Sequence, residues 1–221
     1  MPKVFLSPSN QYNNVYAYGN TTEGVQCGKI AEACKVALER SGIEVKLMHD
    51  ESMQEKCNPS NAFGADLHVC IHTNAFNGKV SGTRMFSYNT NGKGYKACKA
   101  IFSVLAPVTP GTSENIQANP ELYEIRVPAA PTAYIEVDFH DVPNVAKWIV
   151  EHTTEIGEAI AKGICNYFGV AYKSPVAPAP KPTTGVMYQV VTGSFSVKAN
   201  AEKRVAELKA KGFDSFIQIK K

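Results

Sequence analysis

The alternation of strand-like and helix-like segments over the first 170 residues most limits how this chain can fold. Short apolar runs typical of strands are separated by longer stretches with the 3.6-residue period of helices. This alternation is typical of α/β domains, in which helices cover both faces of a mostly parallel sheet. We therefore predict an α/β fold with such a sheet.

Apolar periodicity predicts where the individual elements lie. The expected strands are residues 3–7, 44–48, 67–71, 82–89 and 132–139, and the expected helices are 22–41, 51–64, 93–105 and 142–168. Gly42 ends the first helix, Pro59 weakens the second, and the last is long or broken. In sheets of this kind, ligands bind beyond the carboxyl ends of the strands. Polar residues at strand ends are therefore the first candidates for a site.

A change in composition divides the chain. Residues 173–185, KSPVAPAPKPTTG, are dense in proline and alanine and predict an extended, semi-rigid spacer. We expect a domain over residues 1–172 and a small β-α-β unit over residues 186–221. So short a unit cannot bury much core alone. It needs the rest of its own domain, a second copy or another chain.

Charge is distributed unevenly along the 221 residues, and 44% of them are hydrophobic. From Lys173 onward, nine Lys and Arg face three Asp and Glu, a balance of +6, whereas the preceding residues carry 14 against 17, a balance of −3. The basic tail suits an anionic polymer such as cell wall. The positive excess is small and no recognition motif appears, so nucleic-acid binding is not expected. No run of 18 apolar residues is present, so no membrane span is expected either.

Two further features concern the compartment. The first residues, MPKVFLSPSN, lack the apolar core and cleavage site of a signal peptide, so we expect synthesis in the cytoplasm. The six cysteines are scattered without a C-x-x-C pair, which favours buried free thiols over a disulfide framework or a zinc knuckle.

Polar residues gather at three strand or loop ends. In DLHVCIHTNA, alternation puts His68 and His72 on one face of a strand, and His72 lies at its end, followed by Asn74. Glu136 interrupts the apolar run AYIEV. A carboxylate there needs a partner, either a metal-bound water or a salt bridge to Arg126 or a nearby lysine.

The third group lies after the first strand. This loop carries Asn13 and ends in Glu23, at the start of the first helix. His68 is interpreted as a satisfied or solvent-facing histidine. The remaining histidines are interpreted as structural: His49, His140 and His152.

The order of FLSPSNQ…GNTTEG, ADLHVCIHTNA and TAYIEVDFHD resembles the type 3 catalytic domain of zinc-dependent N-acetylmuramoyl-L-alanine amidases over roughly residues 1 to 170. The resemblance implies a sheet of about six strands and a bound Zn²⁺. It places metal ligands at Glu23 and His72 and the catalytic glutamate at Glu136. Asn74 would hold the His72 loop, and Arg126 would orient Glu136 or contact the polymer.

One family ligand does not match. Related sequences have histidine in an S-P-S-x-Q-x-H pattern, where this chain has Asn13. An amide oxygen is a weaker zinc ligand than imidazole, although both are neutral. Three outcomes remain open: Asn13 binds the metal, a water replaces it, or the site has lost its metal.

The resemblance implies a peptidoglycan hydrolase, an endolysin or an autolysin, that cleaves the amide between N-acetylmuramic acid and L-alanine and acts on the wall after release. The alternatives are a non-catalytic peptidoglycan-binding protein with a decayed site and a zinc amidohydrolase of small substrates. The spacer and basic tail argue against the last, since a soluble substrate needs no anchor. Residues 186–221 resemble one half of a SPOR-type cell-wall-binding repeat. The missing half could come from a second chain, so we predict a homodimer.

Overall fold

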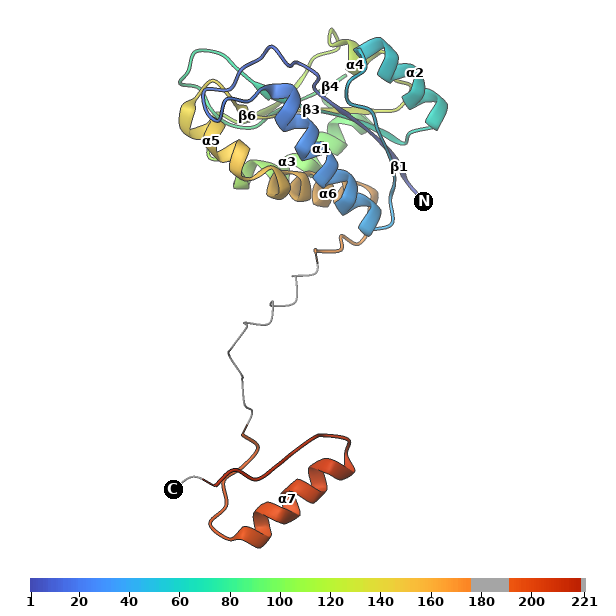
Figure 1. Ribbon diagram of the computed structural model, residues 1–221. Helices are drawn as coiled ribbons and strands as arrows, with labels where there is room; N and C mark the ends of the chain where they lie inside the picture. The colour runs from blue at the N-terminus through green and yellow to red at the C-terminus, as the bar shows by residue number, and fades with distance from the viewer. Residues whose placement is uncertain (176–190, 220–221) are drawn as a thin grey trace. The chain divides into compact units, whose positions relative to one another are not determined.

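The computed structural model describes residues 1–175 and 191–219, which fall into two compact units, Met1–Pro175 and Val176–Lys221 (Figure 1). Most of the spacer predicted at 173–185 lies outside the described residues, as does the start of the β-α-β unit expected over residues 186–221. Within the described part of the chain, no helix is both long and apolar enough to cross a bilayer.

The larger unit is built on a six-stranded sheet in the order β2-β1-β3-β6-β4-β5. Its strands are β1 (Lys3–Pro8), β2 (Glu44–Leu47), β3 (Leu67–Asn74), β4 (Arg84–Ser87), β5 (Asn115–Ala118) and β6 (Thr132–Phe139). Neighbouring strands are parallel except β4 and β6, which are antiparallel. The predicted α/β class with a mostly parallel sheet is confirmed.

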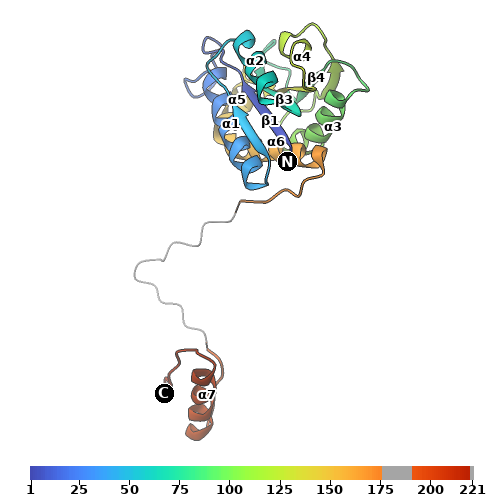
Figure 2. The same cartoon turned by 90° about the vertical axis from the view of Figure 1, so that its right-hand side faces the viewer.

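Helices cover both faces of this sheet (Figures 1 and 2). The helices of this unit are α1 (Glu23–Arg40), α2 (Met53–Phe63), α3 (Lys93–Leu105), α4 (Tyr123–Arg126), α5 (Pro143–Glu151) and α6 (Thr153–Phe168), with a 3-10 turn η1 (Ala106–Val108). The helix expected over 142–168 is broken at His152. Helix α2 continues through Pro59 and is stabilised by a capping box between Ser52 and Glu55 and a left-handed Gly64 at its end.

The two faces of the sheet differ in polarity. One face carries fully buried aliphatic residues such as Leu6, Val69 and Ile135, which belong to one core with residues of α1, α3 and α6. The other face lies under α2 and α4 (Figure 1) and carries Ser7 and His68, both fully buried. Side chains alternate along each strand, so one sequence supplies an apolar core and a polar layer. All six cysteines are buried and free, as expected.

The second unit contains α7 (Lys198–Ala210), the helix predicted for the tail. The strands predicted on either side of it are not formed in the described residues 191–197 and 211–219. A strand needs a hydrogen-bonded neighbour, and so short a unit offers little to pair with. Several of its large apolar side chains are exposed, among them Val191, Phe195, Phe213, Phe216 and Ile219.

Candidate active site

Three of the four residues predicted for the metal site and its base meet at the carboxyl ends of β3 and β6. His72 and Glu136 are register partners on these parallel strands, so their side chains project from the same face. Glu23, the first residue of α1, places Oε1 2.9 Å from Nδ1 of His72. Glu23 therefore meets His72, 49 positions later in the sequence, and Glu136, 113 positions later, at one point.

The loop after β1 completes this group with residues other than Asn13. Asn13 is exposed. Nε2 of Gln11 lies 3.4 Å from Oε1 of Glu23 and 3.5 Å from Nδ1 of His72. Nδ2 of Asn14 donates to the other carboxylate oxygen of Glu23 at 2.7 Å and to Oε1 of Gln11 at 2.9 Å. The amides that contact the candidate ligands thus come from Gln11 and Asn14.

The two supporting residues predicted from the sequence lie in different places. Asn74 is at the end of β3, where its Oδ1 accepts the amide of Ala75 at 2.8 Å and its carbonyl accepts the amide of His140. It thereby shapes the loop that follows His72. Arg126 is exposed on α4 and lines a groove with Thr132, at the opposite end of β6 from the candidate ligands.

Glu136 is held in an enclosed environment. Its Oε2 is buried and has no hydrogen-bond partner among the residues that the structure describes. Burial is the main reason that the pKa of Glu136 is raised to about 7; the charge of His72 opposes this shift and the Glu23 carboxylate adds to it. A carboxyl group with a pKa near neutrality both accepts and returns a proton readily, as a general base requires.

Glu23 and His72 form a charge-stabilised pair. Burial by itself would raise the pKa of Glu23, but hydrogen bonds from His72 and Asn14 outweigh it and lower the pKa. Burial would lower the pKa of His72, but the hydrogen bond to Glu23 and the charge of Glu136 outweigh it and raise the pKa. The pair therefore favours an ionised carboxylate beside the imidazole.

Aromatic packing and a hydrogen-bond chain fix the end of β3. The ring of His72 stacks on Tyr134 with centroids 4.6 Å apart. Its neighbour Thr73 bonds Tyr16 Oη at 2.8 Å and His140 Nδ1 at 2.9 Å, and the rings of Tyr16 and His140 stack at 4.8 Å. The sequence interpretation of His140 as structural missed that it braces the strand end carrying His72. Its position in FHD, directly after the predicted strand of Glu136, was the available signal.

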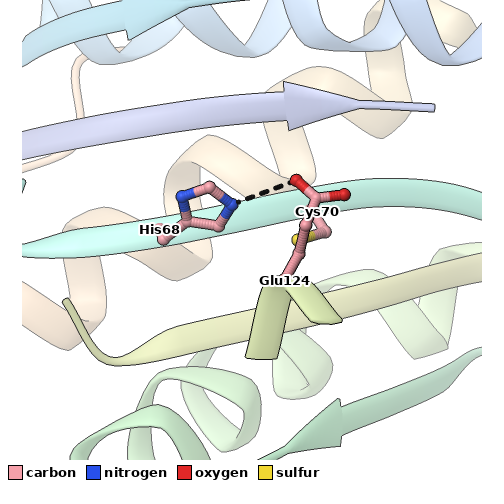
Figure 3. Close-up of side chains that lie close together, drawn as sticks. All are labelled: His68, Cys70 and Glu124. Carbon is pink, nitrogen blue, oxygen red and sulfur yellow. Dashed lines mark hydrogen bonds and ion pairs between the residues drawn. The ribbon is translucent and has the colours of Figure 1, made fainter. Parts of the chain in front are cut away.

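A second polar cluster lies deeper under the same face of the sheet (Figure 3). The ligand atoms of His68, Cys70 and Glu124 lie within 4.8 Å of one another, close enough to hold a metal ion. However, Nε2 of His68 contacts Glu124 at 3.3 Å and its Nδ1 contacts Ser60 at 3.0 Å. Because burial also raises the pKa of the Cys70 thiol well above its usual value, we interpret this cluster as a structural hydrogen-bonded group. His68 is therefore a satisfied histidine, one of the two roles expected for it.

The residues at the strand ends fit a zinc ion better. Glu23 and His72 supply oxygen and nitrogen donors of the kinds that zinc prefers, and the side-chain amide of Gln11 lies beside both with its Nε2 toward them. A turn of that amide would exchange Nε2 for Oε1, the atom able to bind a metal. The buried Oε2 of Glu136 without a protein partner is the position expected for an atom that bonds a ligand.

Comparison with known proteins agrees with this geometry. Residues 10–166 match the family model described as N-acetylmuramoyl-L-alanine amidase, and residues 171–221 match the SPOR domain. A curated relative, the sporulation-specific N-acetylmuramoyl-L-alanine amidase of Bacillus subtilis (strain 168), is 25% identical over 227 residues, covering 100% of this chain and 86% of its own length.

Solved structures show the same fold. The catalytic domain of CwlV, an N-acetylmuramoyl-L-alanine amidase from Bacillus (Paenibacillus) polymyxa var. colistinus, superposes with a TM-score of 0.69 at 17% identity, covering 77% of this chain and 100% of that one. An N-acetylmuramoyl-L-alanine amidase from Clostridium difficile 630 gives 0.68 at 20% identity, covering 76% and 97%. Since the family model spans residues 10–166, more than half of the 221 residues, the chain belongs to the N-acetylmuramoyl-L-alanine amidase family.

Proposed function

We propose that this peptidoglycan amidase uses Glu136 as its general base and holds Zn²⁺ through Glu23, His72 and Gln11. The observation that carries the assignment is the enclosed Oε2 of Glu136, which has no protein partner in the described residues and lies across the register from His72. Gln11 is proposed in the place first assigned to Asn13 because its side-chain amide lies beside both other ligands, and a turn of that amide would replace Nε2 by Oε1, the atom able to bind a metal.

The chemistry of the cleavage follows from these positions. A bound zinc ion supplies a Lewis acid that acidifies a water molecule and polarises the lactyl carbonyl of N-acetylmuramic acid. Glu136 takes the proton of the attacking water and passes it to the departing amine of L-alanine. Its pKa of about 7 keeps the protonated and ionised forms both accessible at neutral pH.

His72 and Glu23 are oriented before substrate arrives. The stacked ring of Tyr134 and the Glu23 carboxylate fix the imidazole of His72, and Asn14 fixes the second oxygen of Glu23. A site held in this way loses little freedom when it binds a metal and substrate.

The test is digestion of purified peptidoglycan by the wild-type protein and by Glu136→Gln, with and without a chelator. We expect new free amino groups without new reducing sugar ends, and we expect both the chelator and the substitution to abolish them. Glu121→Gln, which removes an exposed carboxylate just before α4, serves as the matched control and should retain activity. Amino-group release that survives Glu136→Gln would refute the assigned base. A protein that binds peptidoglycan without releasing amino groups would instead be the non-catalytic binder.

For the tail, we propose that the SPOR-domain segment pairs with a second copy of itself. The exposed apolar side chains of the described part support this, with Phe213 62% and Phe216 74% exposed. Light scattering of the full chain should show a dimer, and Phe213→Ser with Phe216→Ser should give a monomer. A wild-type monomer over the whole concentration range would refute the proposal.

A further inference from the structure

Four polar residues stand side by side across the sheet in one register row. Asn115 on β5 pairs with Arg84 on β4, Arg84 pairs with Glu136 on β6, and Glu136 pairs with His72 on β3. Directly paired residues on neighbouring strands project to the same face. The row therefore begins at the candidate base and metal ligand and continues outward over two further strands.

Three members of this row carry buried polar atoms without a partner in the described part of the chain. These atoms are Nε of Arg84, Oδ1 of Asn115 and Oε2 of Glu136. Nearly all buried polar groups in native proteins are hydrogen-bonded, so each exception requires an explanation. Three of the eight such atoms in the described residues occupy consecutive positions of this one row, which indicates a common cause for these three.

The guanidinium of Arg84 is positioned but not neutralised. One Nη donates to Oγ of Ser113 at 3.0 Å, and the group lies over the ring of Phe139, 5.5 Å from its centroid. Among the described residues, no carboxylate lies within ion-pair distance of Arg84, although Glu136 is its neighbour in the ladder. A pre-oriented arginine without a carboxylate partner in the protein is suited to bind a carboxylate from outside it.

We propose that Arg84 and Asn115 form a subsite for the α-carboxylate of the second residue of the stem peptide. This inference rests on the proposed cleavage at Glu136. In peptidoglycan, L-alanine is followed by a D-glutamyl residue that is linked onward through its side chain, which leaves the α-carboxyl free or amidated. Successive residues of a peptide are about 3.8 Å apart and neighbouring strands about 4.8 Å. The step from L-alanine at the cleaved amide to the D-glutamyl residue therefore corresponds to about one strand beyond Glu136, where Arg84 stands.

The subsite assigns a role to each residue of the pair. Arg84 donates charge-assisted hydrogen bonds to the carboxylate, and Asn115 accepts from a peptide N–H of the stem through Oδ1. A substrate whose α-carboxyl is amidated keeps the second interaction and loses the charge of the first. Discrimination between the two stem chemistries is therefore the property that Arg84 should control.

The experiment compares two soluble substrates, N-acetylmuramyl-L-alanyl-D-glutamate and its D-isoglutamine analogue, with the zinc-loaded full chain. We expect Arg84→Gln to lower kcat/KM about 10- to 100-fold on the carboxylate substrate, mainly through KM, and less than about 3-fold on the amide. Arg84→Lys should recover part of the loss. Lys99→Gln removes one exposed positive charge from α3, against the other face of the sheet, and should leave the ratio of the two substrates unchanged.

A binding titration separates this proposal from the proposed function. N-acetyl-L-alanyl-D-glutamate should bind the wild-type protein more tightly than N-acetyl-L-alanyl-D-isoglutamine, and Arg84→Gln should remove the difference. If the wild type hydrolyses neither substrate but shows this preference, the cleavage assignment fails and the subsite stands. If Arg84→Gln weakens both ligands equally, or neither, the subsite is refuted whatever the activity.

Discussion

His72 and Glu136 face each other from neighbouring strands, yet His72 gives its Nδ1 to Glu23 and leaves Oε2 of Glu136 without a protein partner in the described residues. The three side chains therefore have unequal roles. Glu23 and His72 satisfy each other, while the Glu136 carboxyl is enclosed and free to exchange a proton. The different environments of the two carboxyl groups, not their residue type, distinguish the proposed metal ligand Glu23 from the proposed base Glu136.

This enclosure makes the stability of the metal-free protein depend on pH at Glu136. Burial raises its pKa from 4.5 to about 7, so between these pH values Glu136 is mostly ionised in the unfolded chain and mostly protonated in the folded protein. Stability contributed by the protonated form is present below about pH 4.5 and is lost as the pH rises through about 7. With chelator present, Glu136→Gln should raise the free energy of unfolding by about 1–3 kcal/mol at pH 8 and leave it nearly unchanged at pH 5. Thermal unfolding at the two pH values measures this, and an equal gain at both would contradict it.

The second prediction separates Gln11 from Asn13. Gln11 and Asn13 are both exposed, but only Gln11 contacts Glu23 and His72. Gln11→Ala should therefore weaken zinc binding about 10- to 100-fold, and Asn13→Ala should leave it within about 2-fold. Competition with a chromophoric chelator gives both affinities. Gln11→His should bind zinc more tightly than the wild type, since imidazole is the better ligand. A loss confined to Asn13→Ala would restore the assignment made from the sequence.

Periodicity predicted most of the sheet but not its edge. The strands with apolar alternation were recognised, whereas β5 (Asn115–Ala118) was missed because its four residues, NIQA, are at most partly buried at the sheet edge. Helix α4 was missed because it is a single turn, too short for a period to show. The sequence of such segments carries little information when the neighbouring strand or helix decides their conformation.

For the site, the sequence predicted residues more readily than their contacts. Glu23, His72 and Glu136 were chosen for their positions at element ends and for a family resemblance, and the structure brings the three side chains together. The proposed choice of Gln11 over Asn13 depends on how the loop after β1 folds against α1, where Gly24 donates its amide to the carbonyl of Gln11. The course of the backbone in this loop cannot be predicted from the types of its residues.

The third prediction concerns the buried pair of His68 and Glu124. Burial opposes ionisation of Glu124, but hydrogen bonds from His68 and Ser7 outweigh it and lower the pKa. Removing one partner leaves the other uncompensated, so Glu124→Ala should lower the free energy of unfolding by about 3–5 kcal/mol at pH 7. The destabilisation caused by Glu124→Ala should shrink as the pH falls below 4.5. Glu124 is protonated there first in the unfolded chain and, at still lower pH, in the folded protein.

Urea unfolding at pH 7 and at lower pH provides the measurement. The exposed pair of Lys3 and Glu44, 3.8 Å apart, offers the control. Glu44→Ala should change stability by less than about 1 kcal/mol, because solvent screens the exposed charges. Equal effects at the two sites would show that Glu124 is not stabilised by its buried partners.

The last prediction tests the packing of α6 against α1. A Cβ added at Gly157 would lie 2.6 Å from Cβ of Ala33 and 2.7 Å from the carbonyl oxygen of Ile30. The backbone of a helix cannot yield as a flexible side chain does, so Gly157→Ala must push the two helices apart. We expect a loss of about 1–3 kcal/mol, despite the better helix propensity of alanine. Because Glu23 stands at the start of α1, the displacement should also weaken zinc binding, which thermal unfolding and a metal titration would detect together. An unchanged melting temperature would show that the helices adjust without cost.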